Sequence, residues 1–145
     1  MHRRLASMRK SLLDQGFLDE QFIQLEELQD DSNPNFVEEI AASYYRDSAR
    51  QMLNIDQALD KYPLDFAKLD NLMHQFRGSS SSIGAKKVKN ESTQFQEHCR
   101  TGNAEGCRRT YRQLKKEYAT LKKKLEAYFQ LARQAGPLET ASRPK

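Results

Sequence analysis

The sequence contains few of the residues that cross-link a chain or interrupt its helices. Its 145 residues include two cysteines, four prolines, six glycines and no tryptophan. Cys99 and Cys107 lie eight residues apart, without Cys-x-x-Cys spacing or histidines at zinc-like intervals. We therefore expect reduced, mostly structural thiols and no metal site. No run approaches the roughly 18 apolar residues of a membrane span, and the basic start at 1–4 precedes no long apolar segment. We expect a soluble intracellular protein with no membrane partner.

Charged residues of the same sign cluster in parts of the chain and do not dominate the whole of it. The net charge is +4, the pI is near 9.1, and charged residues make up 30% of the chain. Basic residues concentrate between Arg108 and Lys124, whereas the first forty residues hold nine acidic and four basic ones. A charge run on a long amphipathic helix is usually its solvated side. Because no zinc-finger, basic-zipper or RNP pattern accompanies the charge, we expect no nucleic-acid partner, and a helical nucleic-acid binder is the less favoured alternative.

Apolar residues recur at helical spacing along most of the chain. Turn signals at Gly16, 30–32, Tyr62–Pro63, Gly84 and Gly102–Asn103 divide it into six expected helices. The last of these helices has apolar residues at alternating spacings of four and three, which is typical of a bundle seam. These residues are Cys107, Tyr111, Leu114, Tyr118, Leu121, Leu125 and Tyr128.

Residues suited to helix starts refine this division. Asp19 is placed to cap the second helix, which carries Phe22, Leu25 and Leu28 and is expected to end in the turn at 30–32. Asn33–Pro34 is expected to start the third helix, since proline at the first helical position loses no hydrogen bond. Asp65 is placed to cap the fourth helix and Asn103 the sixth.

The fold class we predict is all-α. An antiparallel four-helix bundle is expected over residues 33–135. Two additional N-terminal helices, in residues 1–32, are expected to pack against one end of it. The tail 136–145 is expected to be disordered.

One histidine falls on the polar side of the fourth expected helix. At about 100° per residue, the apolar residues of this helix occupy one stripe between roughly 240° and 340°. They are Leu69, Leu72, Met73, Phe76 and Ile83. His74, Arg77, Gly78 and Ser81 share the opposite face. A glycine inside a helix costs about 0.5–1 kcal/mol relative to alanine, which indicates that something approaches the backbone at Gly78.

Taken alone, a histidine on a polar helix face is more often only a solvated residue. The segment His74–Gly84, however, resembles the motif of plant histidine-containing phosphotransfer proteins, roughly His-Gln-Leu-Lys-Gly-Ser-Ser-(Ala/Ser)-Ser-(Ile/Val)-Gly-Ala. The match continues through Ala85, Val88, Lys89 and Asn90. Weaker similarity covers about one whole domain. Phe76 and Arg77 stand where leucine and lysine are usual. Members of this family that have lost the function carry asparagine or glutamine in place of the histidine, which is present here.

The resemblance implies a phosphoryl carrier in a multistep two-component phosphorelay. His74 would accept a phosphoryl group from the phospho-aspartate of a hybrid sensor kinase's receiver domain and pass it to a response regulator. Cytokinin signalling, with movement between cytoplasm and nucleus, is implied in the same way. Arg77 would help to neutralise the phosphoryl oxygens, with Gln75 in a supporting role. The chain would need no cofactor, because the receiver domain supplies Mg²⁺, and it would not be an enzyme on its own.

Receiver domains would dock on the His74 face and on exposed parts of the second and third helices. Gly78 and Ser81 are the candidate contacts on this face, and Phe36 and Tyr45 are further candidates that are equally well explained as partly buried residues. We expect a small, transient interface and a monomeric protein. A helical scaffold that binds receiver domains without phosphotransfer is the alternative function. The serines at 79–82 are expected to be structural rather than sites of serine phosphorylation.

Overall fold

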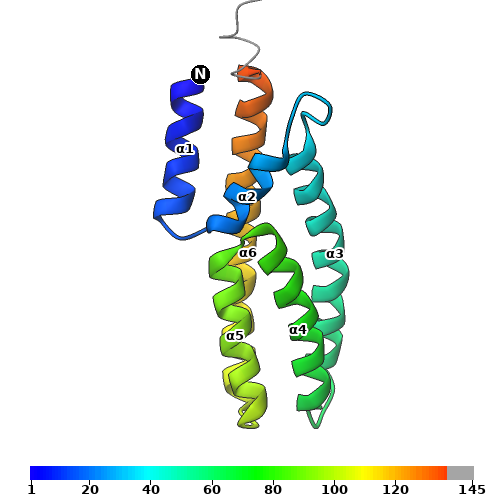
Figure 1. The fold of residues 1–145 in the computed structure, drawn as a ribbon. Coiled ribbons are helices and arrows are strands. Elements are labelled where there is room, and N and C mark those ends of the chain that lie inside the picture. Colours follow the sequence, from blue (N-terminus) through cyan, green and yellow to red (C-terminus); the bar gives the residue numbers. More distant parts are fainter. Residues whose placement is uncertain (137–145) are drawn as a thin grey trace, which may run out of the picture.

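The apolar spacing of the sequence gives one helix for each expected segment. The computed structural model describes residues 1–136, and within them it contains six α-helices and no strand (Figure 1). The helices are α1 His2–Asp14, α2 Glu20–Leu28, α3 Phe36–Leu59, α4 Phe66–Ile83, α5 Lys86–Arg100 and α6 Ala104–Ala135. All but the first residue of the predicted tail, 136–145, lie outside the described residues.

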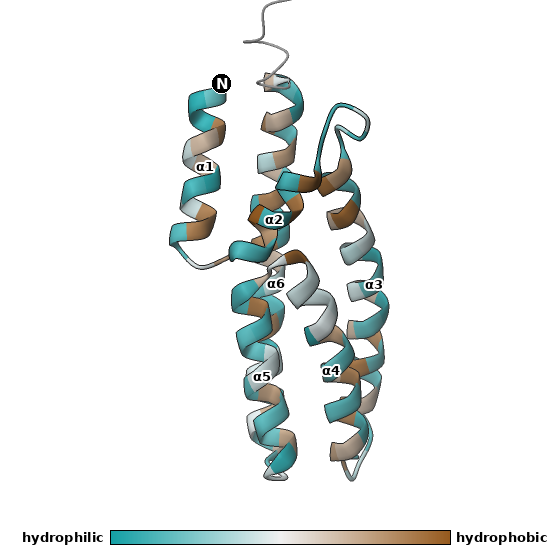
Figure 2. Ribbon diagram, viewed as in Figure 1, coloured by the Kyte–Doolittle hydropathy of each residue, from teal (hydrophilic) through white to brown (hydrophobic). Residues whose placement is uncertain are grey.

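Helices α3 to α6 form the antiparallel bundle. Helix α4 packs between α3 and α5, and α5 also packs on α6 (Figure 1). Each helix carries both hydrophobic and hydrophilic residues (Figure 2). The hydrophobic ones recur at helical spacing, so they lie on the side of the helix that faces the core. The largest fully buried side chains in the bundle come from all four helices. They include Ile55, Leu69, Met73, Phe76, Phe95, Leu114, Leu121 and Leu125.

The two N-terminal helices pack at one end of the bundle, as predicted. Helix α1 lies on α6, and α2 contacts α3 and α4. The link between α1 and α2 pairs with the α4–α5 corner, where the Asp19 N–H donates to the Gly84 carbonyl at 3.0 Å and the Lys86 N–H donates to the Phe17 carbonyl at 3.2 Å. Gly84 has φ +79° there, and an added Cβ would lie 2.8 Å from the Phe22 nitrogen. Both the conformation and the close approach therefore require glycine.

The predicted start of α3 is wrong by two residues. The helix begins at Phe36, after Asn35, and not at Asn33–Pro34. The reason is the side chain of Asp30, which accepts hydrogen bonds from the Ser32 and Asn33 N–H groups at 3.0 and 3.1 Å. These bonds hold the segment in a turn, so the chain enters helical geometry only after it.

Of the three apolar residues named for α2, Phe22 and Leu25 are buried, whereas Leu28 is 65% exposed. Leu28 is the last residue of this helix, and the chain leaves it in an extended conformation at Gln29. The caps expected for the second, fourth and sixth helices are confirmed. The side chains of Asp19, Asp65 and Asn103 accept hydrogen bonds from the N–H groups of Gln21, Lys68 and Gly106.

Candidate functional site

His74 lies on the outer face of α4, as the helical rotation predicts. Two neighbours of His74 in the sequence, Met73 and Phe76, are fully buried. Each of these side chains contributes about 1.5–3 kcal/mol through burial, and together they fix how α4 is turned about its axis. The imidazole therefore remains exposed, and it makes no hydrogen bond or ion pair within residues 1–136. An exposed imidazole without a partner is available to an incoming group.

Arg77 lies one turn after His74 and is half-buried. Its Nε atom is buried and has no hydrogen-bond partner among the described residues. Leaving such a donor unpaired costs about 1–3 kcal/mol, so it is an unusual feature of a folded protein. The guanidinium also makes no ion pair within the described part of the chain. Its positive charge beside His74 is therefore not neutralised by a carboxylate of the described residues.

Gly78 is exposed on the same face. A Cβ built at this position would meet nothing within 4 Å. The protein's own packing therefore does not require a glycine here, in contrast to Gly84. Ser81, half-buried one turn further along, completes this surface, which we call the His74 face: His74, Arg77, Gly78 and Ser81. Gln75 is exposed but points to another side of α4.

Three of the serines at 79–82 form hydrogen bonds within the bundle. The Ser79 hydroxyl donates to the Gln75 carbonyl at 3.2 Å, and the Ser82 hydroxyl donates to the Ser79 carbonyl at 2.6 Å. The fully buried Ser80 shares a 2.8 Å hydrogen bond with the Tyr44 hydroxyl of α3. Burial raises the pKa of Tyr44, so this phenol stays protonated. The bond fixes α4 against α3, and the sequence pattern gave no signal of it.

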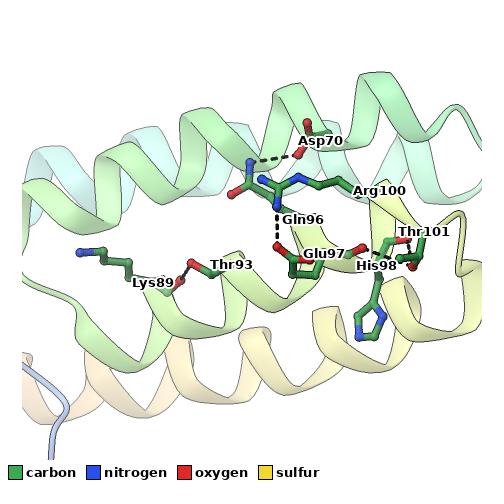
Figure 3. A network of polar contacts seen from close by, with 8 residues as sticks. All are labelled: Asp70, Lys89, Thr93, Gln96, Glu97, His98, Arg100 and Thr101. Carbon is green, nitrogen blue, oxygen red and sulfur yellow. Dashed lines mark hydrogen bonds and ion pairs between the residues drawn. The ribbon is translucent and has the colours of Figure 1, made fainter.

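A second hydrogen bond between side chains joins α4 to α5 (Figure 3). The Gln96 amide of α5, which is 5% exposed, donates to the Asp70 carboxylate at 3.0 Å. Asp70 lies one turn before His74 on α4. Two side-chain hydrogen bonds thus hold α4 on either side of His74 in the sequence. Asp70 bonds to α5 before it, and Ser80 bonds to α3 after it. Sequence analysis missed Asp70, although its position four residues before His74 was visible.

Phe36 and Tyr45 are not brought to the His74 face. Phe36 begins α3 and is partly buried against the core. Since α3 and α4 run antiparallel from the 60–65 turn, Phe36 lies about 20 Å along the bundle from the level of His74. Tyr45 is half-buried, and the Lys122 ammonium of α6 lies 5.2 Å from its ring centroid. Both residues belong to other sides of the bundle.

The His74 face does not line the best-formed cavity of the molecule. A cavity of about 550 Å³ is present at the other end of the molecule, between α1, α2, α3 and α6, and no residue of α4 lines it. Among residues 1–136, no group of three or more His, Cys, Asp or Glu side chains is arranged to hold a metal ion. In that part of the chain no helix combines the length and apolar character needed to cross a membrane.

Known proteins resemble this chain along nearly its whole length. The family model of the Hpt domain matches residues 39–124. Histidine-containing phosphotransfer protein 4 of Arabidopsis thaliana is 68% identical over 116 residues, which cover 80% of this chain and 91% of that protein. Pseudo histidine-containing phosphotransfer protein 5 of rice, Oryza sativa subsp. japonica, is 56% identical over 144 residues, 99% of this chain and 95% of that protein.

Solved structures agree with these relatives. The crystal structure of a histidine-containing phosphotransfer protein from Medicago truncatula superposes with a TM-score of 0.87 at 40% identity. The match covers 99% of this chain and 95% of that one. A histidine-containing phosphotransfer protein from maize superposes with a TM-score of 0.86 at 34% identity, over 93% of this chain and 99% of that one.

Proposed function

The chain belongs to the Hpt family of histidine-containing phosphotransfer proteins, and on this premise we propose that His74 is its phosphoacceptor. The protein would accept a phosphoryl group from the phospho-aspartate of a receiver domain and pass it to a second receiver domain. The observation that carries the proposal is the His74 face itself. It combines an exposed imidazole, an arginine without an ion pair and open space over a glycine.

Each transfer is a displacement at phosphorus. A ring nitrogen of His74 attacks the phosphorus in line, the N–P bond forms, and the bond from phosphorus to the aspartate oxygen breaks. The carboxylate of the receiver domain is released, and the reverse reaction loads the next receiver. Phosphoryl transfer requires chiefly positioning and charge neutralisation. Arg77 supplies positive charge for the phosphoryl oxygens, and the receiver domain would supply Mg²⁺. The chain is thus a carrier and not an enzyme on its own.

Docking on the His74 face follows from this chemistry. Gly78 leaves room for the rim of a receiver's active site, and Ser81 borders it. Gln75 has at most a supporting role from its different side of α4. Phe36 and Tyr45 are weaker candidates for receiver contacts, because both pack against the bundle away from His74. The interface would be small enough to dissociate after each transfer.

The wider biology rests on the relatives' names and on the family resemblance. We propose receiver domains of hybrid histidine kinases and of response regulators as partners, cytokinin signalling as the pathway, and both cytoplasm and nucleus as locations. A monomer would suffice, because the described parts of the His74 face all lie on one helix.

A scaffold that binds receiver domains without phosphotransfer is the second candidate. One observation favours it, namely the 56% and 57% identity to two rice proteins that are named pseudo histidine-containing phosphotransfer proteins. The presence of an exposed histidine at position 74 favours the carrier. The two candidates differ in one respect. A scaffold would bind receivers with or without the imidazole, whereas a carrier must lose its covalent label when the imidazole is removed.

The experiment follows this difference. The protein is mixed with a receiver domain that carries radiolabelled phospho-aspartate and with Mg²⁺, and label on the protein is measured. We expect uptake by the wild type and by His2→Gln and His98→Gln, which remove the other two histidines, and none by His74→Gln. Circular dichroism shows whether each variant keeps its helices. No uptake by the wild type from several active receivers, with binding retained, would support the scaffold.

A further inference from the structure

The two cysteines of the chain meet across the hairpin formed by α5 and α6. Cys99 lies near the end of α5 and Cys107 near the start of α6, on either side of the Gly102–Asn103 turn. Their sulfur atoms are 3.8 Å apart, and both thiols are free. Both side chains are buried, Cys99 at 6% exposure and Cys107 at 0%. Phosphotransfer at His74 uses neither of them.

The backbone around the pair is held in place. The Gly102 N–H donates to the Cys99 carbonyl at 3.2 Å, and the Asn103 N–H donates to the His98 carbonyl at 2.9 Å. The Asn103 side chain accepts from the Gly106 N–H at 2.9 Å, next to Cys107. A disulfide needs a sulfur separation of about 2.05 Å, so the two sulfurs must approach by about 1.8 Å more. With the hairpin backbone held by these hydrogen bonds, the approach would come from rotation of the two side chains.

We propose that Cys99 and Cys107 form a reversible disulfide when the protein meets hydrogen peroxide, which makes the α5–α6 hairpin a site of oxidative modification. One thiolate attacks the O–O bond of the peroxide and becomes a sulfenic acid, and water is released. The second sulfur then attacks the sulfenic sulfur, the S–S bond forms, and a second water leaves with the oxygen of the sulfenic acid. Two thiols are oxidised and one peroxide is reduced to two waters.

The contact between the thiols assigns them different parts in this reaction. The hydrogen bond with the Cys99 thiol lowers the pKa of Cys107, and the nearby Arg108 guanidinium acts in the same direction against the effect of burial. The same hydrogen bond, together with burial, raises the pKa of Cys99. Cys107 is thus the sulfur that ionises first, and Cys99 closes the bond. Burial makes the reaction slow, since peroxide must enter as the hairpin end opens.

The test uses the full chain treated with hydrogen peroxide and digested with trypsin without reductant. Cleavage after Lys89, Arg100 and Arg108 places the two cysteines on separate peptides, Asn90–Arg100 and Thr101–Arg108. We expect these peptides to appear joined. The intact mass should fall by two hydrogen atoms, and dithiothreitol should reverse both changes. Amide hydrogens of the Gly102–Asn103 turn should exchange more slowly in the oxidised protein.

Two variants serve as controls. Cys99→Ala and Cys107→Ala each remove one sulfur with a small side chain in its place, and neither should lose two hydrogen atoms. Three results would overturn the proposal: an unchanged mass after prolonged peroxide treatment, sulfinic acid on one cysteine without the joined peptides, or a disulfide between two chains. Each is distinguished from the expected product by its mass.

Discussion

Two glycines of the α4 motif should respond to the same substitution in opposite ways. Gly78 lies inside α4 with nothing within 4 Å of an added Cβ, so Gly78→Ala gains helix propensity without a clash. The expected gain is about 0.5–1 kcal/mol in the free energy of unfolding. For 145 residues the entropy of unfolding is about 300 cal/mol/K, so Tm should rise by about 2–3 °C.

Gly84→Ala is the matched comparison. At φ +79° an alanine costs about 1–2 kcal/mol, and its Cβ would lie 2.8 Å from the Phe22 nitrogen, which belongs to the backbone and cannot rotate away. Tm should therefore fall by about 3–6 °C or more. Thermal and urea unfolding followed by circular dichroism measure both changes.

The two variants also separate the reasons for each glycine. A larger side chain in Gly78→Leu should leave the helices stable but slow phosphoryl uptake, because it occupies the space proposed for the receiver domain. If Gly78→Ala instead lowers Tm, the glycine serves the protein's own fold, and the reasoning about open space for a partner is wrong.

Three further substitutions or conditions test the site and its support. Arg77→Ala should lower the rate of phosphoryl uptake roughly ten- to hundredfold, the value of one charge-assisted hydrogen bond, while Arg77→Lys should keep most of it. Tyr44→Phe should destabilise the fold by about 1–3 kcal/mol because it leaves the buried Ser80 hydroxyl unpaired. The double variant Tyr44→Phe, Ser80→Ala should cost less than the sum of the single ones in urea unfolding. Burial raises the pKa of Tyr44, Tyr111 and Tyr128, so stability should be steady below about pH 9 and fall above about pH 10, where the unfolded phenols ionise. A urea midpoint that is unchanged at pH 11 would contradict this.

The fold and the exposed histidine were predictable because both depend on local periodicity. The stripe of Leu69, Met73, Phe76 and Ile83 follows from helix geometry, and it fixes which side of α4 carries His74. Caps at Asp19, Asp65 and Asn103 are short-range patterns of the same kind.

The sequence could not show what depends on long-range contacts. The Tyr44–Ser80 bond joins residues 36 positions apart, and the Asp70–Gln96 bond joins residues 26 apart. Tyr45 was expected to be either a receiver contact or a partly buried residue, and only the fold shows that the Lys122 ammonium of α6 lies over its ring. The predicted start of α3 was wrong because the Asp30 side chain accepts a hydrogen bond from the Asn33 N–H and holds this segment in a turn. In contrast, the contact of Cys99 with Cys107 follows from a hairpin whose turn was already visible at Gly102–Asn103.

The most direct measurement is a two-step transfer that follows one phosphoryl group through the protein. Labelled protein, separated from its donor, is first digested to locate the label and then mixed with a second receiver domain and Mg²⁺. We predict acid-labile, alkali-stable label on the tryptic peptide Leu69–Arg77, which holds His74 alone among the histidines, and its transfer to the aspartate of the second receiver. Label on any other peptide, or label that stays on the protein in the presence of active receivers, would contradict a relay through His74.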